Sequence, residues 1–125
     1  LPPSNPVVSI GIILGVPGVR DALRGAVAPV VGVSPIISGR PVRGHADTCL
    51  HVIGVESTAW GVAGLYADFL DGWLVDPADA AGAPAGGPVA ALTSRVYDGP
   101  LLMSDRPGAG RLARAALDLA LELRG

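Results

Sequence analysis

Pro29-Val30-Val31-Gly32-Val33 is the stretch of this sequence that decides the fold. Its β-branched residues follow one another without alternating with polar ones, which predicts a strand covered on both faces. A second strand is expected at Gly72 to Val75, and a last strand or strand pair within Leu92 to Met103. Helical patterns separate these strands. We therefore predict an α/β fold, part of a doubly wound, mostly parallel Rossmann-like sheet with helices on both faces.

The helices are predicted from apolar spacing and from residues that begin or end helices. The longest pattern starts at Asp105, where Leu112 and Leu119 share the inward face with Ala116 and Leu123, and where Arg114 is spaced to pair with Asp118. Ala78 to Pro88 is expected to be a flexible surface connection. A short helix is expected from Ile10 to Leu14, and a second one follows with Pro17 in its first turn, with Val19, Ala22 and Leu23 facing inward and with its end at Gly25. A third helix is expected from His45 to Ile53, where Gly54 stops it. A fourth is expected to be capped by Ser57 or Thr58 and to run to about Leu70.

Composition and charge narrow the functional classes. Half of the 125 residues are hydrophobic, the formal net charge is -2 and lysine is absent, so the positive field that non-specific nucleic-acid binding needs is missing. The lone cysteine, Cys49, cannot form an internal disulfide, and no apolar run reaches the ~20 residues that cross a bilayer. We expect a cytoplasmic protein without a nucleic-acid or membrane partner.

The start of the chain predicts that more of the protein precedes it. Leu1 is not an initiator Met, and a Pro-Pro turn follows it directly, as after the end of a strand. We expect residues 1–125 to be the C-terminal part of a single larger α/β domain whose N-terminal part is absent.

The loop from Leu1 to Gly11 is the first candidate binding segment. It joins an expected strand end to an expected helix start, and at this edge of a parallel sheet the free helix N–H groups suit a phosphate or carboxylate. The alternative is a capped connection that its prolines stiffen. No Walker A lysine is present, which excludes an ordinary P-loop. The candidate phosphate-binding residues here are Ser4, Asn5 and Ser9, which add uncharged hydrogen bonds, and Gly11, which lets a ligand approach the backbone.

The loop from Ser34 to Gly44 follows a strand in the same way. Arg40 and Arg43 are the basic residues closest to the expected ligand edge, and Arg suits two-point contact with phosphate or carboxylate. Ser34 and Gly39 complete this candidate set. The alternative is that both arginines are solvated or pair with Asp47.

Other polar residues are expected to have structural roles. His45 and Cys49 are spaced to share a helix face, but two ligands do not make a zinc site and His51 points elsewhere. Asp76 and Asp79 follow a strand and could act as acids, although a turn and helix-cap role is the expected one. Core packing is expected for the aromatic residues Trp60, Tyr66, Phe69 and Trp73.

Several motifs occur in order along the chain. They are Pro3-Ser4-Asn5-Pro6-Val7-Val8-Ser9-Ile10-Gly11, Val16-Pro17-Gly18-Val19-Arg20, Ala28-Pro29-Val30-Val31-Gly32-Val33-Ser34-Pro35-Ile36-Ile37, Tyr66-Ala67-Asp68 and Leu102-Met103-Ser104-Asp105. Together they closely resemble the second half of the 2-phospho-L-lactate transferase family, and most of all its actinobacterial branch, in which phosphoenolpyruvate supplies the donated group. One departure is Ile12, where the family has proline, which restores a backbone N–H at the helix start.

The resemblance implies a transferase of coenzyme F-420 biosynthesis. It would join a guanosine-diphosphate-activated lactate or enolpyruvate to the deazaflavin alcohol Fo, release GMP and use Mg²⁺. Its partners would be Fo and the donor, and a homodimer is one of the oligomeric states it allows. The metal ligands would lie upstream of Leu1, so these residues are expected to be inactive alone. The alternatives are a nucleotide-sugar-binding regulatory protein of the related fold and a structural remnant. Asn5-Pro6-Val7-Val8 and Tyr66-Ala67-Asp68 favour the transferase.

Overall fold

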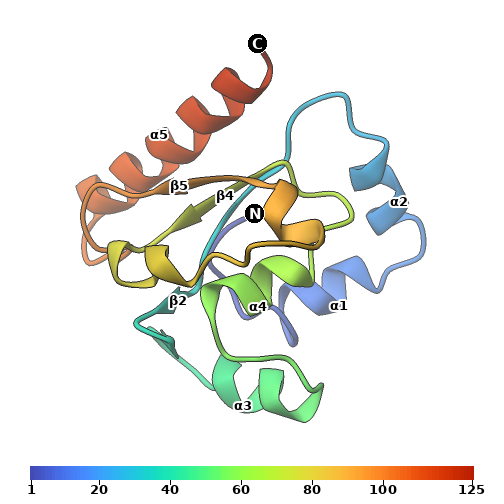
Figure 1. The fold of residues 1–125 in the computed structure, drawn as a ribbon, viewed down its shortest axis with the longest axis horizontal. Coiled ribbons are helices and arrows are strands. Elements are labelled where there is room, and N and C mark those ends of the chain that lie inside the picture. Colours follow the sequence, from blue (N-terminus) through green and yellow to red (C-terminus); the bar gives the residue numbers. More distant parts are fainter.

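The computed structural model describes residues 1–125 without a gap and is built around a parallel sheet (Figure 1). Its strands are β1 (Val31–Val33), β4 (Gly72–Val75) and β5 (Thr93–Val96), in the spatial order β1-β4-β5. Val33 lies opposite Leu74, and Leu74 lies opposite Arg95. The central strand β4 is buried along its whole length. The structure confirms the predicted α/β fold with a parallel Rossmann-like sheet.

Leu1 extends this sheet beyond β1. Its backbone nitrogen donates to the carbonyl of Val31 at 2.6 Å, and the amide of Val33 donates to the carbonyl of Leu1 at 3.1 Å. This bonding is that of a parallel pair. Parallel strands have their carboxyl ends at the same edge of the sheet, so the loop after Leu1 leaves the sheet at the same edge as the loop after β1.

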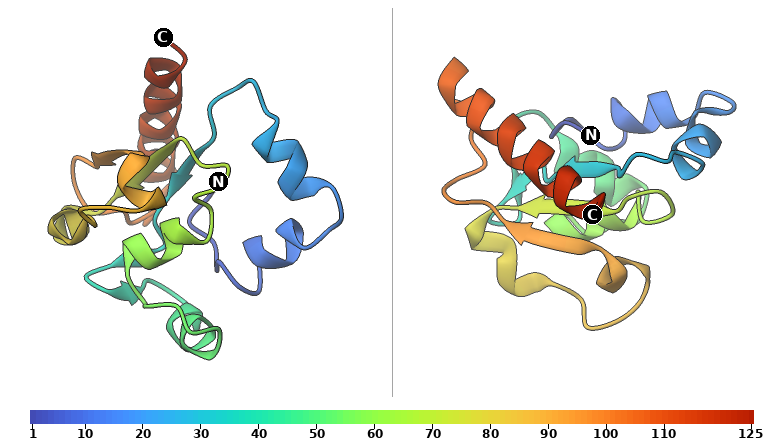
Figure 2. Two further views of the ribbon diagram at one scale, coloured as in Figure 1. Left: turned by 45° about the vertical axis from the view of Figure 1, so that its right-hand side comes forward. Right: turned by 90° about the horizontal axis from the view of Figure 1, so that it is seen from above.

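Helix α5 (Arg106–Leu123) covers one face of the sheet (Figure 2). Leu112 and Leu119 are buried there, in a cluster with Val33 and Leu74, as the apolar spacing predicted. The Asp105 carboxylate caps the helix by accepting from the Gly108 amide at 2.7 Å. The expected pair between Arg114 and Asp118 does not form; the ion pair at this helix joins Arg95 of β5 to Glu122. None of the helices combines the length and apolar character needed to cross a membrane.

The opposite face carries the larger core, beneath α1 (Ile10–Leu14) and α4 (Ala59–Gly64). Thr58 caps α4 by accepting from the Gly61 amide at 2.9 Å. A Cβ at Gly32 of β1 would stand 2.7 Å from the Trp73 ring, so the strand needs glycine at this contact. The predicted core role of the aromatic residues is confirmed, because all four are buried: Trp60, Tyr66, Phe69 and Trp73.

Two helices differ from their predicted extents. Helix α2 (Val19–Arg24) begins after Gly18, whose φ of 87° is left-handed, so Pro17 lies outside the helix and not in its first turn. Ala22, expected to point inward, is exposed. Helix α4 ends at Gly64 instead of continuing to about Leu70, because glycines within it weaken the helix and turns with hydrogen bonds between residues three apart follow it. Helices α1 and α3 (Ala46–Val52) agree with prediction, and Gly54 follows α3 with a φ of 74°.

Two segments that the sequence left irregular contain regular structure. The loop after β1 holds an antiparallel hairpin of β2 (Ile36–Ile37) and β3 (Arg40–Pro41). The expected surface connection from Ala78 to Pro88 overlaps two 3₁₀ helices, η1 (Pro77–Gly82) and η2 (Pro88–Ala91). Both pairs of elements are short, and their sequences lack the alternation or spacing that would have predicted them.

Candidate functional site

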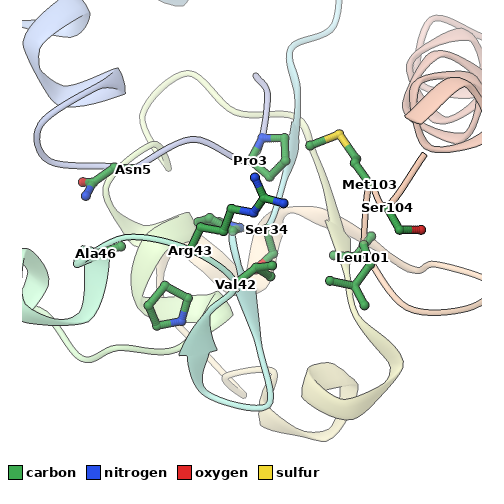
Figure 3. Close-up of a pocket in the computed structure, with 12 residues that line it drawn as sticks. Pro3, Asn5, Ser34, Val42, Arg43, Ala46, Leu101, Met103 and Ser104 are labelled. Atoms are coloured by element: carbon green, nitrogen blue, oxygen red, sulfur yellow. The ribbon is translucent and has the colours of Figure 1, made fainter. Parts of the chain in front are cut away.

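A pocket of about 330 Å³ lies at the carboxyl edge of the sheet (Figure 3). The first loop forms one wall, the hairpin and the start of α3 form a second, and Leu101 to Ser104, after β5, form a third. Open α/β sheets bind ligands at this edge, where loops from neighbouring strands converge. The volume lies within the range of roughly 300–1,000 Å³ that is usual for small-molecule sites.

The pocket lining combines apolar walls with one positive charge. Pro3, Val42 and Leu102 are among the apolar residues, and Arg43 is the one charged residue of the lining. Figure 3 shows the Arg43 side chain extending into the pocket towards Pro3. No salt bridge of the chain includes Arg43. An arginine without a carboxylate partner beside apolar walls suits an anionic group of a ligand that also presents apolar surface to the pocket.

The two predicted arginines are not equivalent. Arg40 is exposed in β3 and does not line the pocket, whereas Arg43 follows the end of β3 and does. The alternative pairing with Asp47 does not form; one oxygen of the Asp47 carboxylate accepts from the amide of Thr48 at 2.9 Å. The structure therefore brings Arg43, but not Arg40, to the pocket.

In the first loop, Asn5 both lines the pocket and shapes the backbone. Its Oδ1 accepts from the amides of Val7 at 2.9 Å and Val8 at 3.1 Å, the geometry of an Asx turn. Ser4 and Ser9 stand outside the lining. Ser9 is the N-cap of α1, yet its hydroxyl makes no capping hydrogen bond and stays available to another partner.

The remaining predicted residues have contacts within the chain. A Cβ at Gly11 would lie 2.8 Å from the carbonyl oxygen of Pro6, so close backbone packing accounts for this glycine. The Ser34 hydroxyl is buried and bonds both the amide and the carbonyl of Ile36, although Ser34 also lines the pocket. The Gly39 amide donates to Asp79, and its φ is 72°.

Sequence reasoning did not assign the third wall to the site. Leu102 and Met103 are exposed apolar residues that line the pocket, and the buried Asp76 holds their segment by accepting from the Leu101 amide at 2.9 Å. The available signal was their position after the last strand, which sends this segment to the shared carboxyl edge. Asp76 also caps η1 through the amide of Ala78, which confirms its predicted turn and cap role.

The side chains near α3 do not assemble a metal centre. No group of three or more His, Cys, Asp or Glu side chains in the chain is placed to hold a metal ion. The side-chain nitrogen Nδ2 of Asn5 lies 3.8 Å from Sγ of Cys49, so Cys49 contacts the first loop.

Comparison with known proteins relates both pocket loops to one family. The model of the family described as 2-phospho-L-lactate transferase CofD matches residues 1–84. The chain belongs to this family. The match includes the first loop and the hairpin wall of the pocket.

Curated relatives of this CofD-family chain extend the similarity to the third wall. Proteins named phosphoenolpyruvate transferase are 60% identical in Thermobifida fusca and 55% identical in Kitasatospora aureofaciens, each over 98% of this chain. The protein of that name from Mycolicibacterium smegmatis is 51% identical over 96% of the chain. The matched region is 36%, 38% and 36% of these relatives, so the chain spans little more than a third of their length.

Proposed function

We propose that these residues belong to a transferase of coenzyme F-420 biosynthesis. The complete protein would move a phosphoenolpyruvyl or phospholactyl group from a guanosine-diphosphate-activated donor to the deazaflavin alcohol Fo and release GMP. Membership of the CofD family and the names of the curated relatives support this proposal. In it, residues 1–125 are the C-terminal part of one larger α/β domain.

The pocket at the carboxyl edge is the single structural observation that carries the proposal. Two of its three walls come from segments that the family model matches, and its one charged residue, Arg43, has no carboxylate partner. A phosphorylated donor needs such a cation, because transfer at phosphorus depends on positioning the reactants and neutralising charge on the transferring group.

The residues of this chain would bind and orient the donor. Arg43 would donate to phosphate or carboxylate oxygens, the apolar walls would exclude water, and the free Ser9 hydroxyl would add a hydrogen bond at the start of α1. In the transfer, the Fo hydroxyl oxygen forms the new bond to phosphorus and loses its proton, and GMP leaves with the electron pair of the broken bond.

The proposed reaction includes Mg²⁺, and the residues of this chain do not fit that ion. No cluster of three or more potential ligands is present. The carboxylates of Asp76 and Asp79, which follow β4, accept hydrogen bonds from backbone amides. We assign the Mg²⁺ ligands to the rest of the protein, and no step here is derived from the metal.

The proposal is tested with the full-length protein, Fo, Mg²⁺ and either the enolpyruvyl or the lactyl donor. Chromatography should show a deazaflavin phosphodiester and one GMP per product, and the ratio of kcat/KM for the two donors identifies the transferred group. Absence of turnover with both donors, together with tight binding of a nucleotide sugar, would instead establish the regulatory alternative. Robust turnover by residues 1–125 alone would show that the active site has been misplaced.

A further inference from the structure

Asp79 joins the segment after β4 to the hairpin that forms one pocket wall. Its carboxylate Oδ2 accepts from the amide of Ser38 at 2.9 Å, and its Oδ1 accepts from the amide of Gly39 at 3.1 Å. These two residues form the turn between β2 and β3. Figure 1 shows η1, which contains Asp79, beside this hairpin. One side chain therefore holds both amides of a turn about 40 residues away in sequence.

The turn has little support of its own. Ser38 has a φ of 53° and is the one residue other than glycine in the chain with a positive φ; Gly39 follows at 72°. Two consecutive positive φ angles suit Asn-Gly or Gly-Gly better than Ser-Gly. The hairpin has two residue pairs, Ile36 with Pro41 and Ile37 with Arg40, and a pairing this short is not stable by itself. The Asp79 bonds supply what the local sequence lacks.

Buried groups hold the backbone at Asp79 in place. Its backbone carbonyl accepts from Nε1 of Trp60 at 3.1 Å, and Trp60 belongs to the main core cluster. At the start of η1, the buried Asp76 accepts from the Ala78 amide. The backbone that carries the Asp79 carboxylate is thus held by Trp60 of α4 and by Asp76 at the end of β4.

The hairpin is followed closely in sequence by Arg43, the one charged residue of the pocket lining. Strand β3 ends at Pro41, and Val42 and Arg43 follow at once in the pocket lining. Asp79 itself is not in that lining. We propose that Asp79 is a positioning residue, which sets Arg43 against the anionic donor by holding the Ser38–Gly39 turn. This inference rests on the proposed transferase function.

The test uses full-length Asp79→Asn, in which an NH₂ group, a donor, replaces one of the two accepting oxygens. Its KM for the donor should rise about tenfold, as the loss of one charge-assisted hydrogen bond would cause. The kcat and the KM for Fo should change less than about twofold, because Asp79 acts through Arg43 alone. The matched control is Asp118→Asn on the outer, exposed side of α5, for which all three constants should stay within the same limit.

A double-mutant cycle shows whether the effect passes through Arg43. In an Arg43→Ala background, Asp79→Asn should raise the KM for the donor no further, because the group that it positions is gone. Ser38→Gly in the Asp79→Asn background should restore part of the donor affinity, since glycine adopts a positive φ readily. Additive effects in the cycle would overturn the proposal, as would an equal rise of both KM values together with a lower melting temperature.

Hydrogen exchange separates a failure of this inference from a failure of the proposed function. In Asp79→Asn, the Ser38 and Gly39 amides should exchange faster while the amides of β4 stay protected. Unchanged exchange at the turn overturns the positioning role, whatever the activity. Faster exchange confined to the hairpin, in a protein whose wild type has no transferase activity, would reject the proposed function and support the Asp79 clamp of the turn.

Discussion

At the scale of single residues, Arg43 and Arg40 give a matched functional comparison. Arg43→Ala should raise the KM for the donor roughly 10–100-fold, because the pocket loses its one charged group. Arg40→Ala should change it less than about threefold, because Arg40 stands outside the lining. Neither variant should lower the melting temperature, since both side chains are exposed and form no salt bridge. Steady-state kinetics and thermal unfolding of the full-length protein check this, and an equal effect at Arg40 would contradict the assignment.

Gly32 gives a stability prediction with a matched glycine as control. An added Cβ would lie 2.7 Å from the Trp73 ring and 3.2 Å from Leu70, so Gly32→Ala should destabilise the protein by about 1–3 kcal/mol. Gly110→Ala, in α5, should stabilise it by up to roughly 1 kcal/mol, because nothing lies within 4 Å of the new Cβ and alanine favours a helix. Urea unfolding measures both changes. Similar stabilities for the two variants would show that the contact between Gly32 and Trp73 does not constrain the core.

The sequence identified residue types better than their contacts. It predicted the core aromatics, because large apolar groups in an apolar chain have few other places to lie. It also brought Arg43 into the candidate set. It could not separate Arg43 from Arg40, because that distinction depends on a hairpin whose Ser38–Gly39 turn is held by the distant Asp79. Sequence reasoning assigned Gly11 to ligand approach and could not foresee the close packing of its backbone against the Pro6 carbonyl.

At the scale of elements, the same reasoning found those that their own sequences specify. Strand β4 was located residue for residue, and α5 by its apolar face and its start at Asp105, because burial and periodicity act within each segment. The hairpin β2–β3 was missed because each strand has two residues, too few for any period. The end of α4 was also missed, because glycine positions and tertiary turns decide it.

The ion pairs that attach α2 to the segment after α4 predict that the stability of the protein depends on pH. Arg20 and Arg24 contact the Asp68 carboxylate at 2.5 and 2.6 Å. Partial burial raises the pKa of Asp68, but the hydrogen bonds from both arginines outweigh it and hold the pKa below its ordinary value. The stabilisation is therefore present above the unfolded-state pKa of about 4 and is lost as the pH falls towards the folded-state pKa.

The variant Asp68→Asn measures how much these ion pairs contribute to the stability of the protein. The variant should be less stable than wild type at pH 7 by no more than about 1 kcal/mol, because the carboxylate is one third exposed and solvent screens the pairs. Thermal unfolding should show the difference narrowing as the pH is taken below about 4. A difference that stays constant from pH 7 to 3 would mean that the ion pairs do not stabilise α2.

At the scale of the whole molecule, the candidate site results from the convergence of three loops. The first loop, the hairpin and the segment after β5 are far apart in sequence, and parallel pairing brings all of them to one edge of the sheet. Sequence reasoning predicted that edge and two of the loops, because each follows an expected strand. It missed the third wall because Leu101 to Ser104 carries no charge that would mark it as a site, and because the buried Asp76 that holds it lies about 25 residues earlier.

The whole surface gives a last prediction. A folded monomer of 12.5 kDa is expected to expose about 6,200 Å², whereas residues 1–125 expose 7078 Å². Part of this exposed surface is apolar: Ile12 in α1, Val16 just after α1, and Leu117 and Leu121 in α5 are exposed. Contiguous exposed apolar side chains drive association, so residues 1–125 produced alone should bind a hydrophobic dye and sediment as concentration-dependent oligomers. Glu substitutions at both leucines should reduce this association without lowering the melting temperature, since neither leucine is buried; a dye-free monomer at all concentrations would contradict the prediction.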